Sequence, residues 1–212
     1  MKLSRFALVA LCPILACAQL VNTATLDSPP LDVSGKLDYY TEKVFSPLSL
    51  LQDAGEVTYA QMENNPKEWG EGWHGVWRRS ADNVGYDAIR NTFMFALNSA
   101  SGGDPRYFRM GDGNFFMRAG FALSQPLVGH ADGGRKVLPW VRLAATFGVA
   151  FLSNVWYPDR LSDTRQALLR GVYTLGTDAT KSFTYEFWPD LKKKLLHHKS
   201  PPQDPGAAVK TP

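Results

Sequence analysis

Apolar residues recur at every third or fourth position through most of this 212-residue chain, and this spacing constrains the fold more than any other feature. Such a period places apolar side chains on one face of an α-helix, whereas a half-buried strand needs strict alternation. No two segments have the alternation of a convincing strand pair. The sequence therefore predicts an all-α fold: a single compact helical bundle of about five to six helices, rich in small residues.

Capping and turn residues indicate where the helices begin and end. Ser46 is a favourable N-cap and Pro47 a favourable first helical residue, and the glycines after Ser101 form a typical helix stop. Asn114 caps a further helix, and Pro189 marks a bend or an end in the last one. The predicted helices cover 36–45, 47–63, 73–101, 115–125, 139–157 and the segment from 162 onward.

The apolar stripes predict which helix faces are buried. We expect Trp73, at the start of the long helix, to anchor the core. Phe183 and Phe187 lie one turn apart in the last helix and should both face the bundle. The segment 144–157 carries no charge, as expected for a helix at the centre of a bundle. The stripe of the long helix comprises Trp73, Trp77, Ala81, Val84, Ala88, Thr92 and Phe95.

Small residues recur on three of these helices, and small faces let helix axes approach closely in soluble bundles and in membrane helices alike. Arg118 and Arg142 lie within or beside the apolar runs. They argue against simple membrane spans, because a charge at mid-membrane is costly. A tightly packed bundle is the main interpretation. In the alternative, the helices 91–101, 115–128 and 143–157 insert into a bilayer or lie on its surface.

The first eighteen residues have the layout of a secretory signal peptide. Residues 1–5 are basic, 6–15 are apolar, and Ala16-Cys17-Ala18 supplies small residues before the expected cleavage. The apolar run is shorter than the roughly 20 residues that span a bilayer. We therefore expect an exported protein, periplasmic or associated with the outer envelope. In a second interpretation, Ile14-Leu15-Ala16-Cys17 is a degenerate lipoprotein site and Cys17 is lipidated.

The expected organisation is a signal peptide at 1–18, a flexible linker at 19–35, a helical domain at 36–199 and a disordered tail at 200–212. Both cysteines, Cys12 and Cys17, lie in the signal peptide, so the exported chain would be free of disulfides and would depend on its core. The formal charge is +3, and loss of Lys2 and Arg5 leaves +1. This near-neutral balance gives no electrostatic reason to expect a nucleic-acid partner.

The sequence contains no recognisable metal or cofactor pattern. The four histidines are His74, His130, His197 and His198, and none has a partner at metal-ligand spacing. The segment 130–134 is expected to be a surface loop. No phosphate-binding loop, dinucleotide fingerprint or G-x-S-x-G motif is present. We therefore expect neither a metal nor a cofactor.

Glu68 and Glu71 are the strongest catalytic candidates. Two carboxylates in an aromatic, glycine-rich loop could cleave a glycan, one as acid and the other as base or nucleophile. In the alternative interpretation, Trp69 and Trp73 are core anchors and the glutamates stabilise a helix N-terminus, where negative charge is favoured. We prefer the alternative, because a catalytic pair needs a cleft that this spacing does not establish.

Arg78, Arg79 and Arg106 are candidate ligand or pocket residues. Several acidic side chains lie near them in the sequence, close to predicted helix ends. Partly buried ion pairs that tie helices together are the simpler explanation of this pattern. A polar ligand-binding pocket is the second explanation.

Several short strings, taken in order, resemble a family of exported bacterial proteins for which no activity is known. They are Phe45-Ser46-Pro47, Glu68-Trp69-Gly70-Glu71-Gly72, Arg78-Arg79, Asp104-Pro105-Arg106-Tyr107-Phe108, Ser153-Asn154-Val155-Trp156-Tyr157-Pro158 and Glu186-Phe187-Trp188-Pro189-Asp190. The resemblance spans roughly 39–196 and implies an exported single-domain protein, without functional residues to transfer.

The leading hypothesis is a non-enzymatic helical protein of the cell envelope that binds or scaffolds an unidentified envelope component. It rests on the expected signal peptide together with the lack of a recognisable catalytic grouping. The alternatives are a glycan-cleaving enzyme that uses Glu68 and Glu71, and a helical protein embedded in or lying on a membrane.

Overall fold

The computed structural model describes residues 23–24 and 28–197. The predicted signal peptide at 1–18, which includes the lipidation candidate Cys17, lies outside the described residues. So do the predicted tail at 200–212 and two parts of the predicted linker, 19–22 and 25–27. The described residues contain no cysteine.

The fold is all-α, as the sequence predicted, with six α-helices in the described part of the chain. They are α2 (Val33–Val44), α3 (Pro47–Met62), α4 (Gly72–Ser101), α5 (Phe115–Ser124), α6 (Trp140–Leu152) and α7 (Thr164–His197). Short 3-10 helices connect them: η1 (Lys67–Trp69), η2 (Gln125–Leu127), η3 (Ser153–Val155) and η4 (Asp159–Leu161).

The predicted capping residues start and stop the helices. The Ser46 side chain accepts a hydrogen bond from the Ser49 amide at 3.1 Å, and the Asn114 side chain accepts one from the Met117 amide at 2.9 Å. Gly102 ends α4 in the left-handed conformation, with φ of 66°. The start of α2 was predicted three residues too late, because Asp32 is its N-cap.

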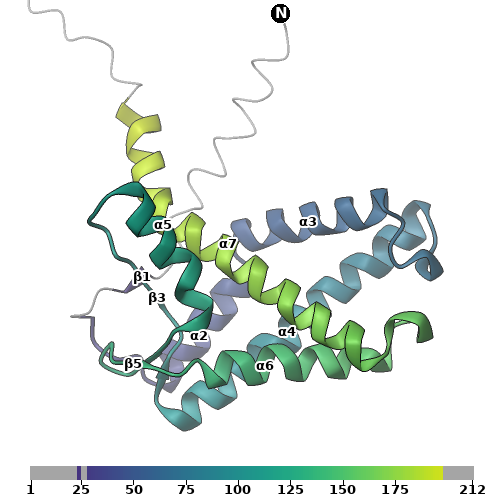
Figure 1. Ribbon diagram of the computed structural model, residues 1–212, viewed down its shortest axis with the longest axis horizontal. Coiled ribbons are helices and arrows are strands. Elements are labelled where there is room, and N and C mark those ends of the chain that lie inside the picture. Colours follow the sequence, from purple (N-terminus) through teal and green to yellow (C-terminus); the bar gives the residue numbers. More distant parts are fainter. Residues whose placement is uncertain (1–22, 25–27, 198–212) are drawn as a thin grey trace, which may run out of the picture.

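The helices cross rather than run parallel. The long helix α4 packs against α2, α3 and α6, and α7 packs against α5 and α6. In Figure 1, α7 runs diagonally over the molecule while α3 and α6 lie nearly horizontal above and below it. Pro189 lies inside α7, and the helix continues beyond it to His197. Of the two predicted alternatives at Pro189, a bend or an end, the helix end is wrong.

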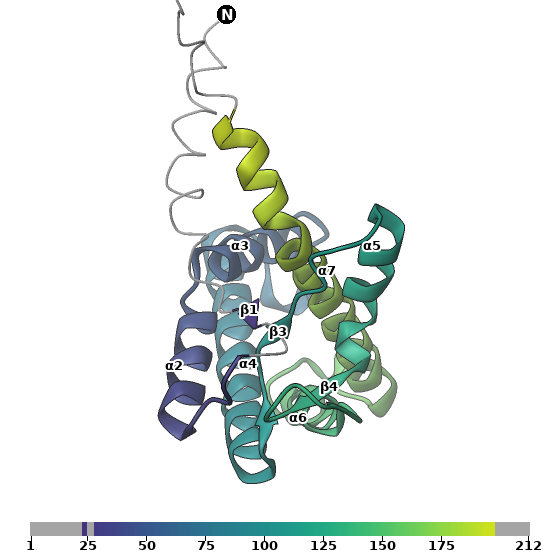
Figure 2. The same ribbon diagram turned by 90° about the vertical axis from the view of Figure 1, so that its left-hand side faces the viewer.

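Two small sheets, which the sequence did not predict, accompany the helices. The pair β1 (Thr23–Ala24) and β3 (Tyr107–Phe108) is parallel, and β2 (Gly103–Asp104), β4 (Gly129–Ala131) and β5 (Lys136–Val137) form an antiparallel sheet. Figure 2 shows β1 and β3 between α2 on one side and α5 on the other. Strands of two or three residues are too short to show a periodic pattern. The predicted surface loop at 130–134 is wrong at His130, which is buried against Phe108.

The buried face of α4 is the polar one, contrary to the prediction. Trp73 and Trp77 are 87% and 74% exposed, whereas Arg79 and Arg90 are buried. The reversal has a physical reason, because both arginines find hydrogen-bond partners inside the fold. Of the two predicted tryptophan anchors, Trp69 is buried against Tyr157, with ring centroids 5.2 Å apart, and Trp73 is not.

Glu186 on α7 is a second buried polar group that ties elements together. It is fully buried, and its carboxylate accepts hydrogen bonds from Arg118 on α5 at 2.8 Å and from the Tyr107 hydroxyl at 2.9 Å. The backbone amides of Met110 and Gly111 also donate to it, at 3.1 and 3.0 Å. Burial raises its pKa, but these donors outweigh burial and lower it. Glu186 is thus ionised and structural.

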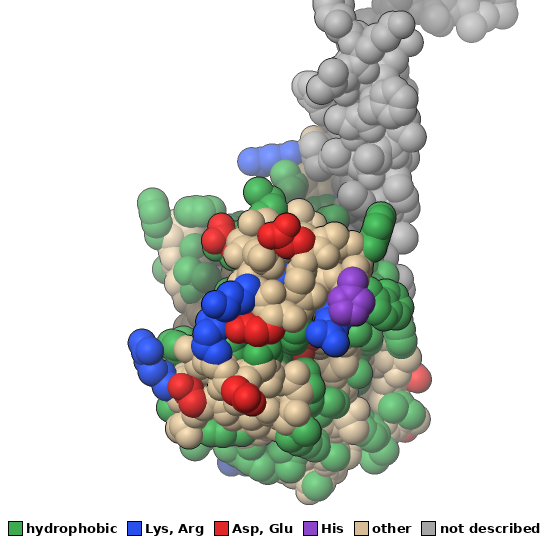
Figure 3. Space-filling view, turned by 90° about the vertical axis from the view of Figure 1, so that its right-hand side faces the viewer, with side chains coloured by type: hydrophobic (Ala, Val, Ile, Leu, Met, Phe, Trp, Pro, Cys, Tyr) green, Lys and Arg blue, Asp and Glu red, His purple; other side chains and the backbone are tan. Residues whose placement is uncertain are grey.

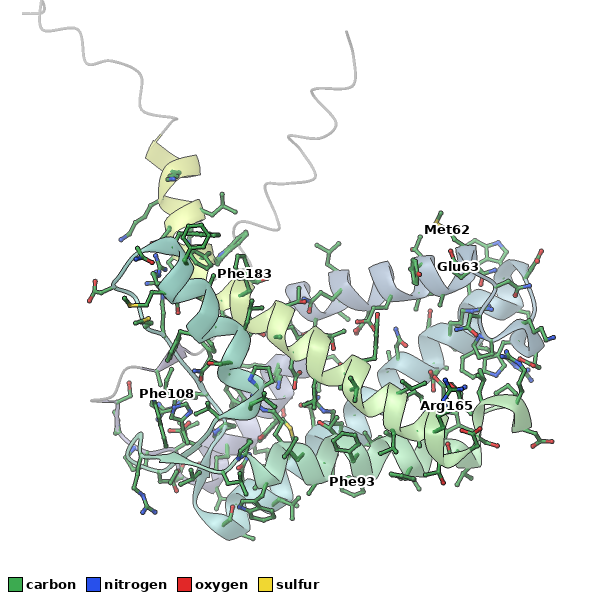
Figure 4. The ribbon with its side chains drawn as sticks, in the orientation of Figure 1. Met62, Glu63, Phe93, Phe108, Arg165 and Phe183 are labelled. Carbon is green, nitrogen blue, oxygen red and sulfur yellow. The ribbon has the colours of Figure 1, made fainter. Side chains whose placement is uncertain are left out.

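Phe183 and Phe187 were predicted to face the bundle; they pack against each other and against α5, and both are partly buried. Their ring centroids are 4.7 Å apart, and the ring of Phe115 on α5 lies 6.3 and 5.1 Å from them. Figure 4 shows Phe183 where α5 and α7 meet, whereas Met62 extends outward from the end of α3. This aromatic cluster joins α5 to α7.

Candidate functional site

Glu68 and Glu71 are held by different partners. Both oxygens of Glu68 accept hydrogen bonds from Arg160, at 3.0 and 3.3 Å, and Glu71 accepts one from Asn64 at 3.0 Å. The hydrogen bond from Arg160 lowers the pKa of Glu68. A general acid in glycan cleavage needs a raised pKa, so this arrangement does not favour the glycan-cleaving hypothesis.

The three candidate arginines lie in different surroundings. Arg79 is 2% exposed, and Arg78 is exposed beside an open groove on α4. Arg106 borders an internal cavity, where it forms an ion pair with Asp104 at 2.6 Å. The structure therefore brings no two of the five predicted site residues into one pocket.

Arg79 holds the loop between α3 and α4. All five of its N–H groups donate, to oxygens of Gln61, Asn64, Asn65, Pro66 and Gly70 at 2.8–3.3 Å. Each acceptor is uncharged. Arg79 is therefore a structural residue whose hydrogen-bonding capacity is fully used.

The cavity that Arg106 borders has a volume of about 190 Å³ and is partly open to solvent. Parts of α2, α4, α6, α7 and the antiparallel sheet form its wall. Its polar lining includes Tyr39, Tyr40, Lys43, His130, Arg142 and Ser182.

One face of α2 supplies three lining residues. Tyr39 and Lys43 are four residues apart and therefore project from the same side of the helix, with Tyr40 between them. The Tyr40 hydroxyl accepts a hydrogen bond from Asn98 on α4 at 2.7 Å, which fixes its ring in the wall. The Lys43 ammonium lies 6.0 Å from the centre of that ring. The Tyr40 hydroxyl therefore has a hydrogen-bond partner within the protein, and the Tyr40 ring lies beside the Lys43 ammonium.

Four polar side chains that line the cavity form no hydrogen bond to any described residue. The hydroxyls of Tyr39 and Ser182, the His130 imidazole and the Lys43 ammonium are in this state. Ser182 and His130 are each only 7% exposed. Their polar atoms are accessible through the cavity, so they are available to a polar ligand that enters it.

The charges around the cavity are unbalanced. The carboxylate of Asp178 is neutralised by Arg90, and that of Asp104 by Arg106. Lys43 has no carboxylate within ion-pair distance among the described residues, and nor has Arg142, whose guanidinium donates to the Gln125 carbonyl oxygen at 2.7 Å. Lys43 and Arg142, together with the exposed Arg135 at the edge, therefore line the cavity without a carboxylate partner among the described residues.

Lys181 adds to the positive charge of the cavity wall. Its closest carboxylate is Asp87, at 4.0 Å. Burial is the main cause that lowers the pKa of Lys43 to about 7; Asp178 opposes it, and Arg90, Lys181 and Arg142 add smaller effects in the same direction as burial. Burial, together with Arg142, also lowers the pKa of His130. The wall thus favours an anion and disfavours additional cations.

Sequence reasoning missed Tyr39, Lys43, Arg142, Lys181 and Ser182 as site residues. The spacing of Tyr39 and Lys43 was visible, but their lack of partners depends on α6 and α7, which lie about 100 residues or more away. Within the described residues, no group of three or more His, Cys, Asp or Glu is arranged to hold a metal ion.

A second surface feature is the open groove along α4, with a volume of about 670 Å³. Trp77 and Trp156 line it, and Asp82 at its edge accepts hydrogen bonds from Trp156 at 2.7 Å and Tyr157 at 2.6 Å. Figure 3 views the end of the molecule where α4 begins, and shows hydrophobic side chains around a group of charged ones.

Comparison with family models, with curated proteins and with solved structures gives no match for this chain. The candidate site therefore rests on its geometry.

Proposed function

We propose that this chain is an exported binding protein of the cell envelope, and that its internal cavity binds a small anionic ligand. The observation that carries the proposal is the pair of cations, Lys43 and Arg142, which face the cavity without a carboxylate. An anion would neutralise them, and the free groups of Tyr39, His130 and Ser182 would supply its hydrogen bonds.

The cavity volume limits the size of this ligand. An enclosed cavity of about 150 Å³ accommodates benzene, and this cavity measures about 190 Å³. The ligand therefore has on the order of six to ten non-hydrogen atoms. A compact carboxylate or a phosphate fits within this volume.

Calorimetry with acetate, lactate, succinate and inorganic phosphate tests the proposal. We expect at least one of these anions to bind at one site per chain, and Arg142→Gln to weaken binding at least tenfold. Arg165→Gln is the matched control, because Arg165 is exposed at the far end of α7 (Figure 4). If the folded protein bound none of the four anions, the proposal would be wrong.

The envelope location is supported by the basic, apolar and small-residue segments of 1–18. Cell fractionation and N-terminal sequencing of the purified protein test it directly. Cleavage after Ala18 and recovery outside the cytoplasm are the expected results. Metabolic palmitate labelling that is lost in Cys17→Ala would instead indicate lipidation.

The exposed tryptophans favour a second candidate function, attachment to a membrane surface. Trp73 and Trp77 lie one turn apart on the outer face of α4, with Arg78 beside them, and tryptophan is enriched at membrane–water interfaces. No described helix is both long enough and apolar enough to cross a membrane.

Co-sedimentation with vesicles of phosphatidylethanolamine and phosphatidylglycerol tests this candidate. We expect binding, with a blue shift of tryptophan fluorescence, that is lost when Trp73 and Trp77 are both replaced by Ser. Trp140→Ser is the control, since Trp140 is also exposed but belongs to α6. Equal binding of both variants would exclude an attachment through Trp73 and Trp77.

A further inference from the structure

We infer that Lys43 is a covalent attachment site, and that its amine captures a small carbonyl compound bearing an acid group as an imine. This inference rests on the proposed function, because the compound would occupy the same cavity. It adds a chemical class to that ligand: a 2-oxo acid or an aldehyde acid.

The position of Lys43 separates it from the other lysines near the cavity. Lys36 is buried but paired with Asp132 at 3.1 Å, and Lys181 lies 4.0 Å from Asp87. The Lys43 amine lines the cavity with no carboxylate or hydrogen-bond acceptor among the described residues. Its nitrogen is therefore open to a molecule that enters.

Burial of Lys43 favours the reactive form of its amine, and three neighbouring cations add to this effect against the opposing charge of Asp178. With a pKa of about 7, about half of the Lys43 side chains are uncharged at pH 7, whereas in an ordinary lysine of pKa about 10.4 fewer than about 0.1% are. Nucleophilic lysines are activated in this way, by burial or by a neighbouring cation. Arg90, Lys181 and Arg142 are the cations in this case.

The same cations orient the reactant. A carboxylate that pairs with Arg142 places its adjacent carbonyl group inside the cavity that Lys43 also lines. Binding of the acid group therefore raises the local concentration of the carbonyl carbon at the amine. A neutral carbonyl compound lacks this attachment.

The reaction balances without an oxidant or a reductant. The lone pair of the uncharged Lys43 amine attacks the carbonyl carbon, a C–N bond forms, and one amine proton passes to the carbonyl oxygen, which gives a carbinolamine. The C–O bond then breaks, and the oxygen leaves as water with the second amine proton, which leaves a C=N bond. Tyr39 lies one turn before Lys43 and lines the same cavity, and its hydroxyl is un-ionised because burial raises its pKa.

Reductive trapping tests the inference. The purified protein is incubated with pyruvate and sodium cyanoborohydride at pH 7, and its peptides are mapped by mass spectrometry. We expect the reduced pyruvate adduct on Lys43 at least tenfold faster than on the exposed Lys67 of the same sample. Excess lactate, which has no carbonyl group, should slow labelling of Lys43 and leave Lys67 unchanged.

Two outcomes separate this inference from the proposed function. If lactate binds the protein in the calorimeter but Lys43 is labelled no faster than Lys67, the imine is wrong and the anion-binding proposal stands. If Lys43 is labelled rapidly but no anion binds or competes, the anion-binding proposal is wrong. Lys43→Arg keeps the charge and should abolish the adduct at this position, whereas Lys181→Arg should retain it.

Discussion

Arg90 on α4 and Asp178 on α7 face each other across the helix interface, with the guanidinium nitrogens 3.1 and 2.5 Å from the two carboxylate oxygens. The remaining Arg90 nitrogen, Nε, donates to the Thr146 hydroxyl on α6 at 3.0 Å. Both charged groups are buried. This bidentate ion pair joins α4 to α7, and the hydrogen bond to Thr146 joins α4 to α6. Together they keep the polar face of α4 buried.

Removal of one partner leaves the other charge buried. We expect Asp178→Asn to lower the free energy of unfolding by about 3–5 kcal/mol, the usual cost of breaking a buried pair, as measured by urea denaturation. The double variant Arg90→Met, Asp178→Leu is the control and should lose less than the single variant. A single variant as stable as the wild type would contradict the buried pair.

The same pair predicts how stability changes in acid. Burial raises the pKa of Asp178, but Arg90 outweighs burial and holds it well below its ordinary value. Because the folded pKa is below the unfolded pKa of about 3.9, the contribution is complete above that pH and is lost as pH falls toward the folded pKa. The difference in melting temperature between wild type and Asp178→Asn should therefore shrink below pH 4.

The lowered pKa of Lys43 predicts that stability also depends on pH above neutrality. Burial lowers its folded pKa to about 7, below the unfolded value of about 10.4. Between these two pH values the unfolded chain binds more protons, so stability rises with pH. The Asp178 and Arg90 pair, Lys181 and Arg142 face this amine.

The uncharged variant Lys43→Met has no such dependence. We expect the melting temperature of the wild type, relative to Lys43→Met, to increase from pH 6 to pH 9 in ligand-free buffer. Lys67→Met, a change at an exposed lysine, should show no such trend. A constant difference across this range would mean that Lys43 titrates as an ordinary surface lysine.

The adjacent Arg78 and Arg79 provide a matched pair of substitutions. Arg79→Lys removes the planar fork that reaches five acceptors, and a lysine cannot reproduce it. With net contributions of about 0.5–1.5 kcal/mol for each hydrogen bond, we expect a loss of several kcal/mol in chemical denaturation. Arg78→Lys, on the exposed side, should change stability little. Similar effects of the two substitutions would contradict the assigned orientation of α4.

The two exposed tryptophans of α4, Trp73 and Trp77, should contribute little to stability although they are apolar. If Trp73 and Trp77 were core anchors, as the period suggested, truncation of either would cost about 3–5 kcal/mol. Since both are largely exposed, we expect Trp73→Ser and Trp77→Ser to keep nearly the full free energy of unfolding. Met94→Ala, a change on the buried face of the same helix, should be clearly destabilising.

Local chemistry made the helix ends predictable, whereas the buried faces depended on distant partners. Ser46, Asn114 and Gly102 act through residues no more than four positions away, so the sequence alone reveals them. The orientation of α4 depends on Asp178, which is 88 residues from Arg90. The spacing of apolar residues alone therefore predicted the wrong buried face for α4.

The candidate site could not be predicted from the sequence for the same reason, because it depends on residues that are distant in the chain. The resemblance and the charge pattern drew attention to Glu68 and Arg79, whose hydrogen bonds to other residues of the chain are complete or nearly so. Lys43 stood out in no motif. Its significance comes from the partners that it lacks, and only the packing of α2 against α4, with α6 and α7 around the cavity, reveals that lack.

The last prediction concerns the junction of α5 and α7. Phe183 packs against Phe115 and Phe187, and truncation of a buried phenylalanine costs about 3–5 kcal/mol. Because Phe183 is only partly buried, we expect Phe183→Ala to lose about 3 kcal/mol and to melt clearly below the wild type. Leu191→Ala, at an exposed position of the same helix, should melt within a degree or two of it.

A chain that ends at Ser200 should also melt like the full protein, because 201–212 has no apolar period with which to dock. Differential scanning calorimetry of the four proteins compares them directly. Were Phe183→Ala to melt with the other three, α7 would not be docked through its aromatic cluster, and the arrangement of α5 against α7 would be wrong. Lower melting of the shortened chain alone would instead show that the tail contacts the domain.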